Sequence, residues 1–218
     1  MKPEVPNPNP FGPDSPHRPL VAILRGLPPE QAGDIAAALI AAGISLIEVP
    51  MNRPGALQAL SAMVRDHGDR ALIGAGTVLG TDQVRRLAEV GGRWAVSPNF
   101  NPAVLQAALA EGLWAMPGVA TPSEAFAAWE GGAHALKLFP NQAVPPAALK
   151  AWRTVLTSEV PLYPVGGMQA DNLADYRAAG ASGAGFGSAL YQPGDAPQTV
   201  HARASALVRA WESCAVSG

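Results

Sequence analysis

The chain has 218 residues, of which 48% are hydrophobic and 15% are charged. This composition excludes an intrinsically disordered chain, which carries few apolar side chains and many charges. Lys and Arg number 15 against 17 Asp and Glu, for a formal net charge of -2. The charge balance therefore gives no sign of the basic surface that proteins use to bind nucleic acids or anionic membranes. We expect the partner to be a small molecule.

Cysteine and histidine usage argues against disulfides and metal sites. Cys214 is the sole cysteine, and the four histidines are scattered without ligand spacing. No stretch reaches the 18 or more apolar residues of a membrane span, and prolines follow Lys2 where a signal peptide would have an apolar core. We expect a cytoplasmic protein that requires neither a metal nor another cofactor.

The first 19 residues differ in composition from the rest of the chain. They hold seven of the 22 prolines, interleaved with Asn, Asp and Ser. A segment of this kind is typical of an extended polar chain. We therefore predict a Pro-rich extended tail over residues 1–19 and one globular domain over residues 20–218.

From residue 20 onward, short apolar runs alternate with Ala-rich stretches. We predict strands at residues 20–24, 46–49, 71–74, 94–97, 114–116, 135–139, 162–165 and 184–187. Their starts recur about every 23 residues, the length of a compact strand-helix unit.

Helix signals fill the intervals between these strands. We predict helices at 28–42, 81–90, 121–130 and 171–179, with Thr81 and Thr121 as N-cap residues and a glycine after each helix. No dinucleotide-binding fingerprint follows the first strand. The pattern favours an α/β fold with a single (β/α)8 TIM barrel over a doubly wound open sheet, which remains the alternative.

In such a barrel the active site lies at the carboxyl ends of the strands, so polar residues there are candidates for function. Lys137 lies between two leucines within the sixth run, where its ammonium must either reach solvent or be desolvated. Desolvation favours the neutral amine, which is a nucleophile for carbonyl carbon. Glu48 could move protons and Arg25 could hold an acid group. The competing interpretation is structural, with Lys137 paired to a carboxylate and Glu48 serving as the partner of Arg25 or Lys137.

A glycine-rich cluster follows the last two predicted strands. Gly166 and Gly167 end the seventh run, and Gly187 and Ser188 end the eighth. Backbone amides at these two successive strand ends predict an anion site, which favours a phosphorylated ligand. A Gly-Gly pair is also common in plain turns.

The sequence resembles the class I 2-keto-3-deoxy-6-phospho-sugar-acid aldolases from residue 20 to residue 191. The motifs that carry the resemblance are Ala-Ile-Leu-Arg-Gly, Ile-Glu-Val-Pro, Ile-Gly-Ala-Gly-Thr-Val, Ser-Pro-Asn, Met-Pro-Gly-Val-Ala-Thr-Pro-Ser-Glu, Leu-Lys-Leu-Phe-Pro and Val-Gly-Gly. The resemblance implies a (β/α)8 barrel that needs no metal and assembles as a homotrimer.

The resemblance also implies roles for individual residues. Lys137 would form the Schiff base and Glu48 would be the general acid/base. The implied substrate contacts are Arg25 and Thr77 around the pyruvyl carboxylate, Pro98 and Phe139 as walls of the pyruvyl pocket, and Gly166, Gly167, Gly187 and Ser188 around the phosphate.

Within the family that the sequence resembles, two further substrate-binding positions differ between the branches that use different sugar acids. The gluconate-derived branch tends to have arginine four residues after the glutamate and threonine before Gly-Gly, where this chain has Asn52 and Val165. Valine cannot donate a hydrogen bond to the C4 hydroxyl, whose configuration distinguishes the two substrates. These positions favour the galactonate-derived branch. Departures from that branch are Asn141-Gln142 and Phe186.

Three alternatives stay open from the sequence. The first is the gluconate-derived branch, including 4-hydroxy-2-oxoglutarate aldolases. The second is a barrel that isomerises or epimerises a sugar phosphate, which would not need a desolvated lysine beside an arginine. The third is a ligand-binding barrel without catalysis.

Overall fold

A computed structural model describes residues 8–214. Nine short strands run through this part of the chain: β1 (Leu20–Ile23), β2 (Leu46–Pro50), β3 (Leu72–Gly76), β4 (Trp94–Val96), β5 (Trp114–Met116), β6 (Gly118–Val119), β7 (Leu136–Leu138), β8 (Leu162–Pro164) and β9 (Ala184–Phe186). All eight predicted strands are confirmed, with ends that differ by at most two residues. The additional strand, β6, is a continuation of β5 beyond Pro117, which has no N–H to donate to a ladder.

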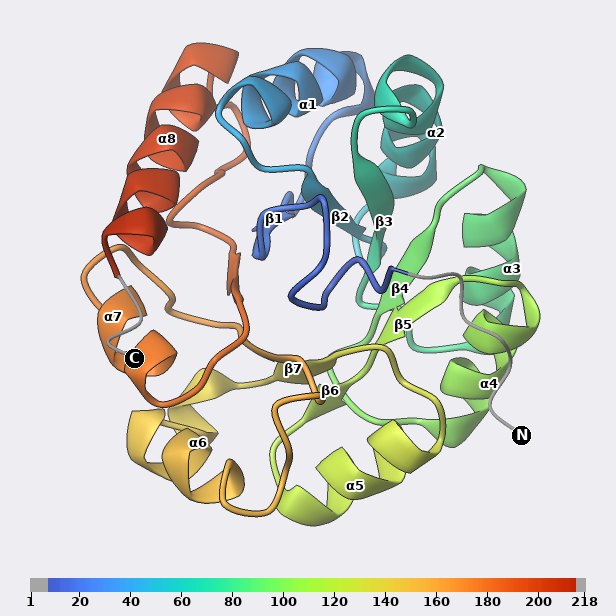
Figure 1. Cartoon of the computed structure of the whole chain (residues 1–218). Helices are drawn as coiled ribbons and strands as arrows, with labels where there is room; N and C mark the ends of the chain where they lie inside the picture. The colour runs from blue at the N-terminus through green and yellow to red at the C-terminus, as the bar shows by residue number, and fades with distance from the viewer. Residues whose placement is uncertain (1–7, 215–218) are drawn as a thin grey trace.

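Between residues 8 and 214, eight α-helices connect or follow the strands: α1 (Ala32–Ala41), α2 (Ala56–His67), α3 (Thr81–Glu89), α4 (Pro102–Ala110), α5 (Pro122–Glu130), α6 (Pro146–Trp152), α7 (Leu173–Ala178) and α8 (Pro197–Ser213). They follow one another in chain order around the outside of the strands, and α8 closes the circle beside α1 (Figure 1). The helices lie on the outer side only, unlike those of a doubly wound sheet.

The strands are parallel throughout. Six of them form one sheet in the order β5-β4-β3-β2-β1-β9, and the other three form a sheet in the order β6-β7-β8. An isolated parallel bridge joins Val165, after β8, to Gly185 in β9. The α/β class with a parallel half-barrel is thus confirmed, and the carboxyl ends of all strands face one end of the molecule.

Two predicted helix starts have different outcomes. The Thr121 hydroxyl accepts a hydrogen bond from the Glu124 N–H, and the Glu124 carboxylate accepts one from the Thr121 N–H, which makes a complete capping box for α5. Thr81 is not an N-cap residue: α3 begins at Thr81 itself, and Gly80 occupies the cap position without a side-chain bond. Helix α3 therefore lacks the side-chain cap that α5 has.

The inward faces of the strands share an apolar cluster that contains large aromatic side chains. Trp94 and Tyr163 are fully buried there. Glycines opposite them make the space: a Cβ on Gly74 would lie 2.2 Å from Trp94 Cδ1, and one on Gly183 would lie 2.3 Å from Tyr163 Cε1. The Trp94 indole N–H donates to the Ile47 and Leu72 carbonyls at 3.1 Å, so its polar atom is satisfied.

The N-terminal segment corrects one expectation. Within the described part of the predicted tail, residues 8–19 form turns instead of an extended chain, and Phe11 is 1% exposed. This segment crosses the middle of the space between the two sheets (Figure 1). The proline and polar composition concealed one aromatic side chain that packs into the interior.

Candidate active site

A pocket of about 990 Å³ lies at the carboxyl ends of the strands. Its lining residues are Ile23, Arg25, Gly26, Arg53, Thr77, Pro98, Lys137, Phe139, Val165, Gly166, Gly167, Met168, Gln169, Gly187, Ser188, Ala189, Tyr191, Gln192 and Pro193. They follow or end β1, β2, β3, β4, β7, β8 and β9, so one cavity collects the strand ends. The sequence prediction of a site at this end of the fold is consistent with this geometry.

Lys137 lines the pocket, and Glu48 does not line it but lies beside Lys137 in the interior. Lys137 lies in the middle of β7 and Glu48 in β2, and their side chains are 8% and 2% exposed. Lys137 Nζ is 4.0 Å from Glu48 Oε1 and 5.0 Å from the centre of the Phe139 ring. The alternation of side chains along both strands directs these two residues inward, into an interior that is otherwise apolar.

Burial changes the acidity of Glu48. Removal from water raises the pKa of this carboxyl, and the nearby charges of Lys137 and Arg25 lower it by less. Gly76 provides the room for the carboxylate, since a Cβ there would lie 2.4 Å from Glu48 Oε1. A carboxyl with a raised pKa beside an amine is suited to accept and return protons at a pH above the range in which an exposed glutamate titrates.

Two arginines and a threonine occupy the adjacent part of the pocket. Arg25 and Arg53 line it, and neither makes a hydrogen bond or ion pair to another side chain among residues 8–214. Thr77 follows β3 with a φ of 56°, a conformation that a threonine adopts at a cost in strain. Such strain often accompanies functional positions, and here it places Thr77 at the pocket wall.

Apolar side chains form the rest of the wall near Lys137. Pro98 and Phe139, which the resemblance implies as walls of a pyruvyl pocket, both line this pocket. Val165 also lines it and is 7% exposed. These residues exclude water from the amine without offering it a competing hydrogen bond.

The glycine-rich cluster lies at the same pocket. Gly166 and Gly167 adopt φ values of 108° and 68°, which side chains larger than glycine rarely accept. Gly187 and Ser188 line the pocket from the end of β9. Successive backbone N–H groups at such turns can bind an anion. Helix α7 begins at Leu173, two residues later than predicted, and has six residues.

Three residues named in the sequence analysis do not line the pocket. Asn52 is exposed and is not among the pocket-lining residues, whereas its neighbour Arg53 is. Asn141 is buried behind Gly166, and its amide donates to Met168 Sδ at 3.3 Å. The Phe186 side chain packs into the core and leaves the pocket to its glycine neighbours.

Sequence reasoning missed Arg53. Its signal was available, because it belongs to the same loop as Asn52 and carries a charge in a chain that has few. The register of the loop after β2 decides which side chain faces the pocket, and no sequence pattern shows that register.

The described residues include no group of three or more His, Cys, Asp or Glu that could hold a metal ion. No helix within residues 8–214 is long and apolar enough to span a membrane. Across that range no Asp or Glu lines the pocket, so Arg25, Arg53 and Lys137 give it a positive potential.

A parallel α/β fold with a buried lysine and glutamate at its carboxyl-end pocket defines the class: an enzyme equipped for amine chemistry on a small anionic carbonyl compound. The chain belongs to the KDPG and KHG aldolase family, whose model matches residues 16–201.

Relatives with names are similar over most of their length. The chain is 46% identical over 90% of its length to a probable 2-dehydro-3-deoxy-6-phosphogalactonate aldolase of Rhizobium meliloti, covering 92% of that protein. It is 44% identical over 88% of its length to the 2-dehydro-3-deoxy-6-phosphogalactonate aldolase of Escherichia coli K12, covering 94% of it.

Solved structures agree with these relatives. A native KDPGal structure superposes with a TM-score of 0.88 at 43% identity and covers 90% of this chain and 96% of that one. A KDPG aldolase from Legionella pneumophila, which holds pyruvate as a covalent carbinolamine intermediate, superposes with a TM-score of 0.76 at 29% identity, covering 90% of this chain and 94% of that one.

Proposed function

We propose that this enzyme is a class I aldolase that cleaves 2-dehydro-3-deoxy-6-phosphogalactonate to pyruvate and glyceraldehyde 3-phosphate. The observation that carries the proposal is the buried pair of Lys137 and Glu48, 4.0 Å apart at the base of a positively charged pocket. Related proteins with that activity in their names support the choice of substrate.

The reaction begins at the amine of Lys137. The amine must lose a proton before it attacks the C2 ketone, and Glu48, with its raised pKa, is the adjacent proton acceptor. Attack forms a carbinolamine, whose hydroxyl takes up a proton and leaves as water. The resulting iminium carbon withdraws electrons from the C3–C4 bond.

Bond cleavage then needs a base at the C4 hydroxyl. Glu48, directly or through a water, removes that proton as the C3–C4 electron pair moves toward the iminium, and glyceraldehyde 3-phosphate departs. The enamine left on Lys137 takes a proton at C3. Water adds to the imine carbon, and collapse of the carbinolamine releases pyruvate and the free amine.

The substrate has an anion at each end, and the pocket offers a group for each. Arg25 and Thr77 would hold the carboxylate beside Lys137, with Pro98 and Phe139 enclosing the pyruvyl part. Gly166, Gly167, Gly187 and Ser188 would hold the phosphate through backbone and hydroxyl donors. The unpaired Arg53 adds positive charge that favours a substrate with two anionic groups over an uncharged sugar.

The first experiment tests the Schiff base. Incubation with pyruvate followed by borohydride reduction is expected to add one pyruvate-derived mass, located at Lys137 by peptide mapping. Lys137→Arg keeps the charge but lacks a nucleophilic amine and should give no adduct, whereas Lys150→Arg on α6 should label as the wild type does. An unlabelled wild type would contradict the proposal and would favour the isomerase or the non-catalytic barrel.

The second experiment tests the choice of epimer. We expect kcat/KM to be higher for the galactonate-derived substrate than for its gluconate-derived C4 epimer. Val165 lines the pocket, so Val165→Thr introduces a donor there and should shift the ratio of kcat/KM values toward the gluconate-derived epimer by about 10-fold, the value of one neutral hydrogen bond. Val165→Ile is the control that adds volume without a donor.

A wild type that prefers the gluconate-derived epimer would contradict this assignment and leave the Schiff-base mechanism intact. Relatives at 35% and 32% identity are named 2-dehydro-3-deoxy-phosphogluconate aldolase and KHG/KDPG aldolase, so that alternative is the specific competitor. Asn52, named from the resemblance for the same choice, does not line the pocket, so the experiment uses Val165.

Four finer features belong to the same proposal. We propose that the two sheets, linked by the bridge between Val165 and Gly185 and by the chain at Pro117, form one closed (β/α)8 barrel. Residues 20–218 would be the barrel domain, preceded by the N-terminal segment 1–19, whose Phe11 packs into the barrel interior. The family resemblance supports a homotrimer. A single cysteine supports a reducing, cytoplasmic location.

A further inference from the structure

We propose that Phe11, held in place by Asn9, is a positioning residue for Lys137 and Glu48: it closes the interior of the strands on the side opposite the pocket and keeps water from reaching the pair from below. The inference rests on the proposed function of that pair. It assigns a role to the Pro-rich N-terminal segment, whose composition alone predicted none.

The Phe11 side chain lies in the apolar interior between the strands. Its centre is 5.3 Å from that of Trp94, 6.2 Å from that of Tyr163 and 6.5 Å from that of Trp114, and the last two pairs are nearly perpendicular. Edge-to-face contacts of this kind are favourable for aromatic rings. Strands β4, β5 and β8 each supply one of these partners, so one side chain fills the space between them.

Hydrogen bonds fix the backbone around this ring. The Asn9 side chain accepts from the Phe11 N–H at 3.0 Å and donates to the His134 carbonyl at 2.8 Å. The Tyr163 hydroxyl donates to the Phe11 carbonyl at 3.1 Å. The ring is therefore held at a defined depth and does not rest on apolar contact alone.

The contacts of Phe11 continue to the catalytic pocket. Phe11 belongs to one buried apolar cluster with Ile23 and Val165, against which Phe139 packs. These three residues also line the pocket at the opposite end. Tyr163 is the register partner of Lys137 between β7 and β8. The Lys137 side chain is thus next to the apolar cluster to which Phe11 belongs.

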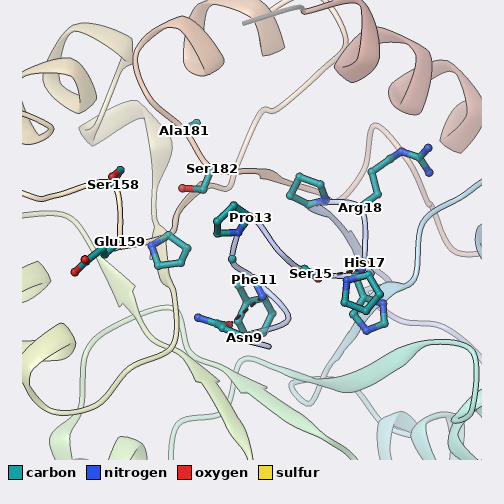
Figure 2. A pocket seen from close by; sticks show the side chains of 14 residues that line it. Asn9, Phe11, Pro13, Ser15, His17, Arg18, Ser158, Glu159, Ala181 and Ser182 are labelled. Atoms are coloured by element: carbon teal, nitrogen blue, oxygen red, sulfur yellow. Dashed lines mark hydrogen bonds between the residues drawn. The ribbon is translucent and has the colours of Figure 1, made fainter. Parts of the chain in front are cut away.

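On its other side Phe11 faces a second cavity. This cavity measures about 1190 Å³, and polar residues such as Ser15, Ser158 and Glu159 line it together with Phe11 and Asn9. Figure 2 shows Phe11 and Asn9 next to each other in this cavity, with Ser158 and Glu159 on a separate segment. Loss of the ring would join this polar cavity to the apolar interior.

Water in that interior would hydrate Glu48, whose side chain is 2% exposed in the folded protein. The charged groups that face Glu48 are Lys137 from β7 and Arg25 after β1, while β3 presents glycines to it. Tyr163 and His134 are the titratable groups beside Phe11, and burial raises the pKa of Tyr163, so that phenol stays protonated. Burial is the cause that raises the pKa of Glu48, and hydration reverses it.

The test compares Phe11→Ala with the wild type in the full chain. We expect the acid limb of the kcat profile to move to lower pH by about one unit, because a hydrated Glu48 ionises more readily. The rate of borohydride-trapped pyruvate adduct formation should fall about tenfold, because Lys137 loses its fixed position. Phe11→Leu should restore most of both values.

Two controls separate positioning from loss of stability. Leu39→Ala truncates a fully buried side chain of α1 in the outer core, so it should lower the Tm to a similar extent without moving the pH profile. Asn9→Ala leaves the ring in the chain and releases its anchor, and it should move the profile in the direction of Phe11→Ala by a smaller amount.

A folded Phe11→Ala with the wild-type pH profile and trapping rate would overturn the inference. If Phe11→Ala does not fold, an Asn9→Ala variant with the wild-type profile would overturn it equally. A wild type that forms no pyruvate adduct contradicts the proposed function instead, so the two failures are distinguishable.

Discussion

Glu48 and Lys137 illustrate how two residues acquire chemistry from their surroundings. Each would be an ordinary solvated charge on a surface strand, yet both lie in an apolar interior with 4.0 Å between their charged atoms. The pKa of Glu48 is raised because burial outweighs the attraction of its cationic neighbours. A proton can therefore pass between substrate and carboxylate at a pH where an exposed glutamate would stay ionised.

Glu48→Gln tests the role of this carboxyl. The amide cannot accept a proton, so kcat should fall by about 10²–10⁴. In the wild type, kcat should decline as the pH falls through the raised pKa of Glu48, a limb above the usual glutamic acid range that is absent from the variant. Steady-state rates measured from about pH 4 to pH 8, a range that begins near the ordinary pKa of a glutamic acid, report both effects.

Glu111→Gln is the matched control, because Glu111 is exposed at the end of α4 and should leave kcat unchanged. Wild-type turnover in Glu48→Gln would return Glu48 to a structural role as the partner of Lys137.

At the scale of elements, short sequence signals fixed most boundaries, and their success depended on local contacts. Thr121, Pro122 and Glu124 predicted the start of α5 because all the groups of a capping box lie within one turn. Thr81 offered a weaker signal, since it has an acidic neighbour but lacks a Glu or Gln three residues later. Strand ends were similarly predictable from apolar runs, whereas β6, which follows β5 after Pro117, was not predicted.

Thr121→Ala should destabilise the protein by about 0.5–2 kcal/mol, the usual value of an N-cap bond, without changing kcat. Urea unfolding measures the change in free energy. Thr81→Ala is the control with the same chemical change at a helix start that has no side-chain cap, so it should be nearly neutral. Equal losses in the two variants would mean that the capping box contributes little.

The pH dependence of the same motif follows from Glu124. Backbone hydrogen bonds from Ala120 and Thr121 hold the pKa of this carboxyl below its usual range. Its stabilising contribution is therefore present above the ordinary glutamic acid pKa and is lost as the pH falls through the lowered value. Thr121→Ala keeps these backbone bonds but removes the bond from the Thr121 hydroxyl, which also lowers the pKa of Glu124, so the difference between the variant and wild type should shrink on acidification.

At the scale of the whole molecule, the pocket and the N-terminal segment occupy opposite ends of one interior. Seven strand ends contribute to the pocket, and residues 8–19 cross the other end, where Phe11 is buried (Figure 1). Lys137 and Glu48 therefore lie between the pocket at one end and the N-terminal segment at the other, and Phe11 and Lys137 are more than 100 residues apart in sequence. Parallel strands align their carboxyl ends, so residues that are far apart in the sequence meet at one end of the fold.

The sequence by itself determined the order and type of the elements and the residues with unusual chemistry. Lys137 was identifiable because a lysine between two leucines in a buried strand must either reach solvent or have its amine desolvated. The paired glycines were identifiable because they mark tight turns with exposed backbone amides. Both are local properties, readable from a few adjacent residues.

Only the tertiary structure decided which distant residues meet. It placed Arg53 and not Asn52 at the pocket, and it turned Phe11 of the Pro-rich segment into the interior. Loop register and the packing of a single aromatic ring depend on contacts between residues far apart in the chain. Hydrophobic periodicity carries no information on such contacts, so they become visible only once the strands and helices have packed.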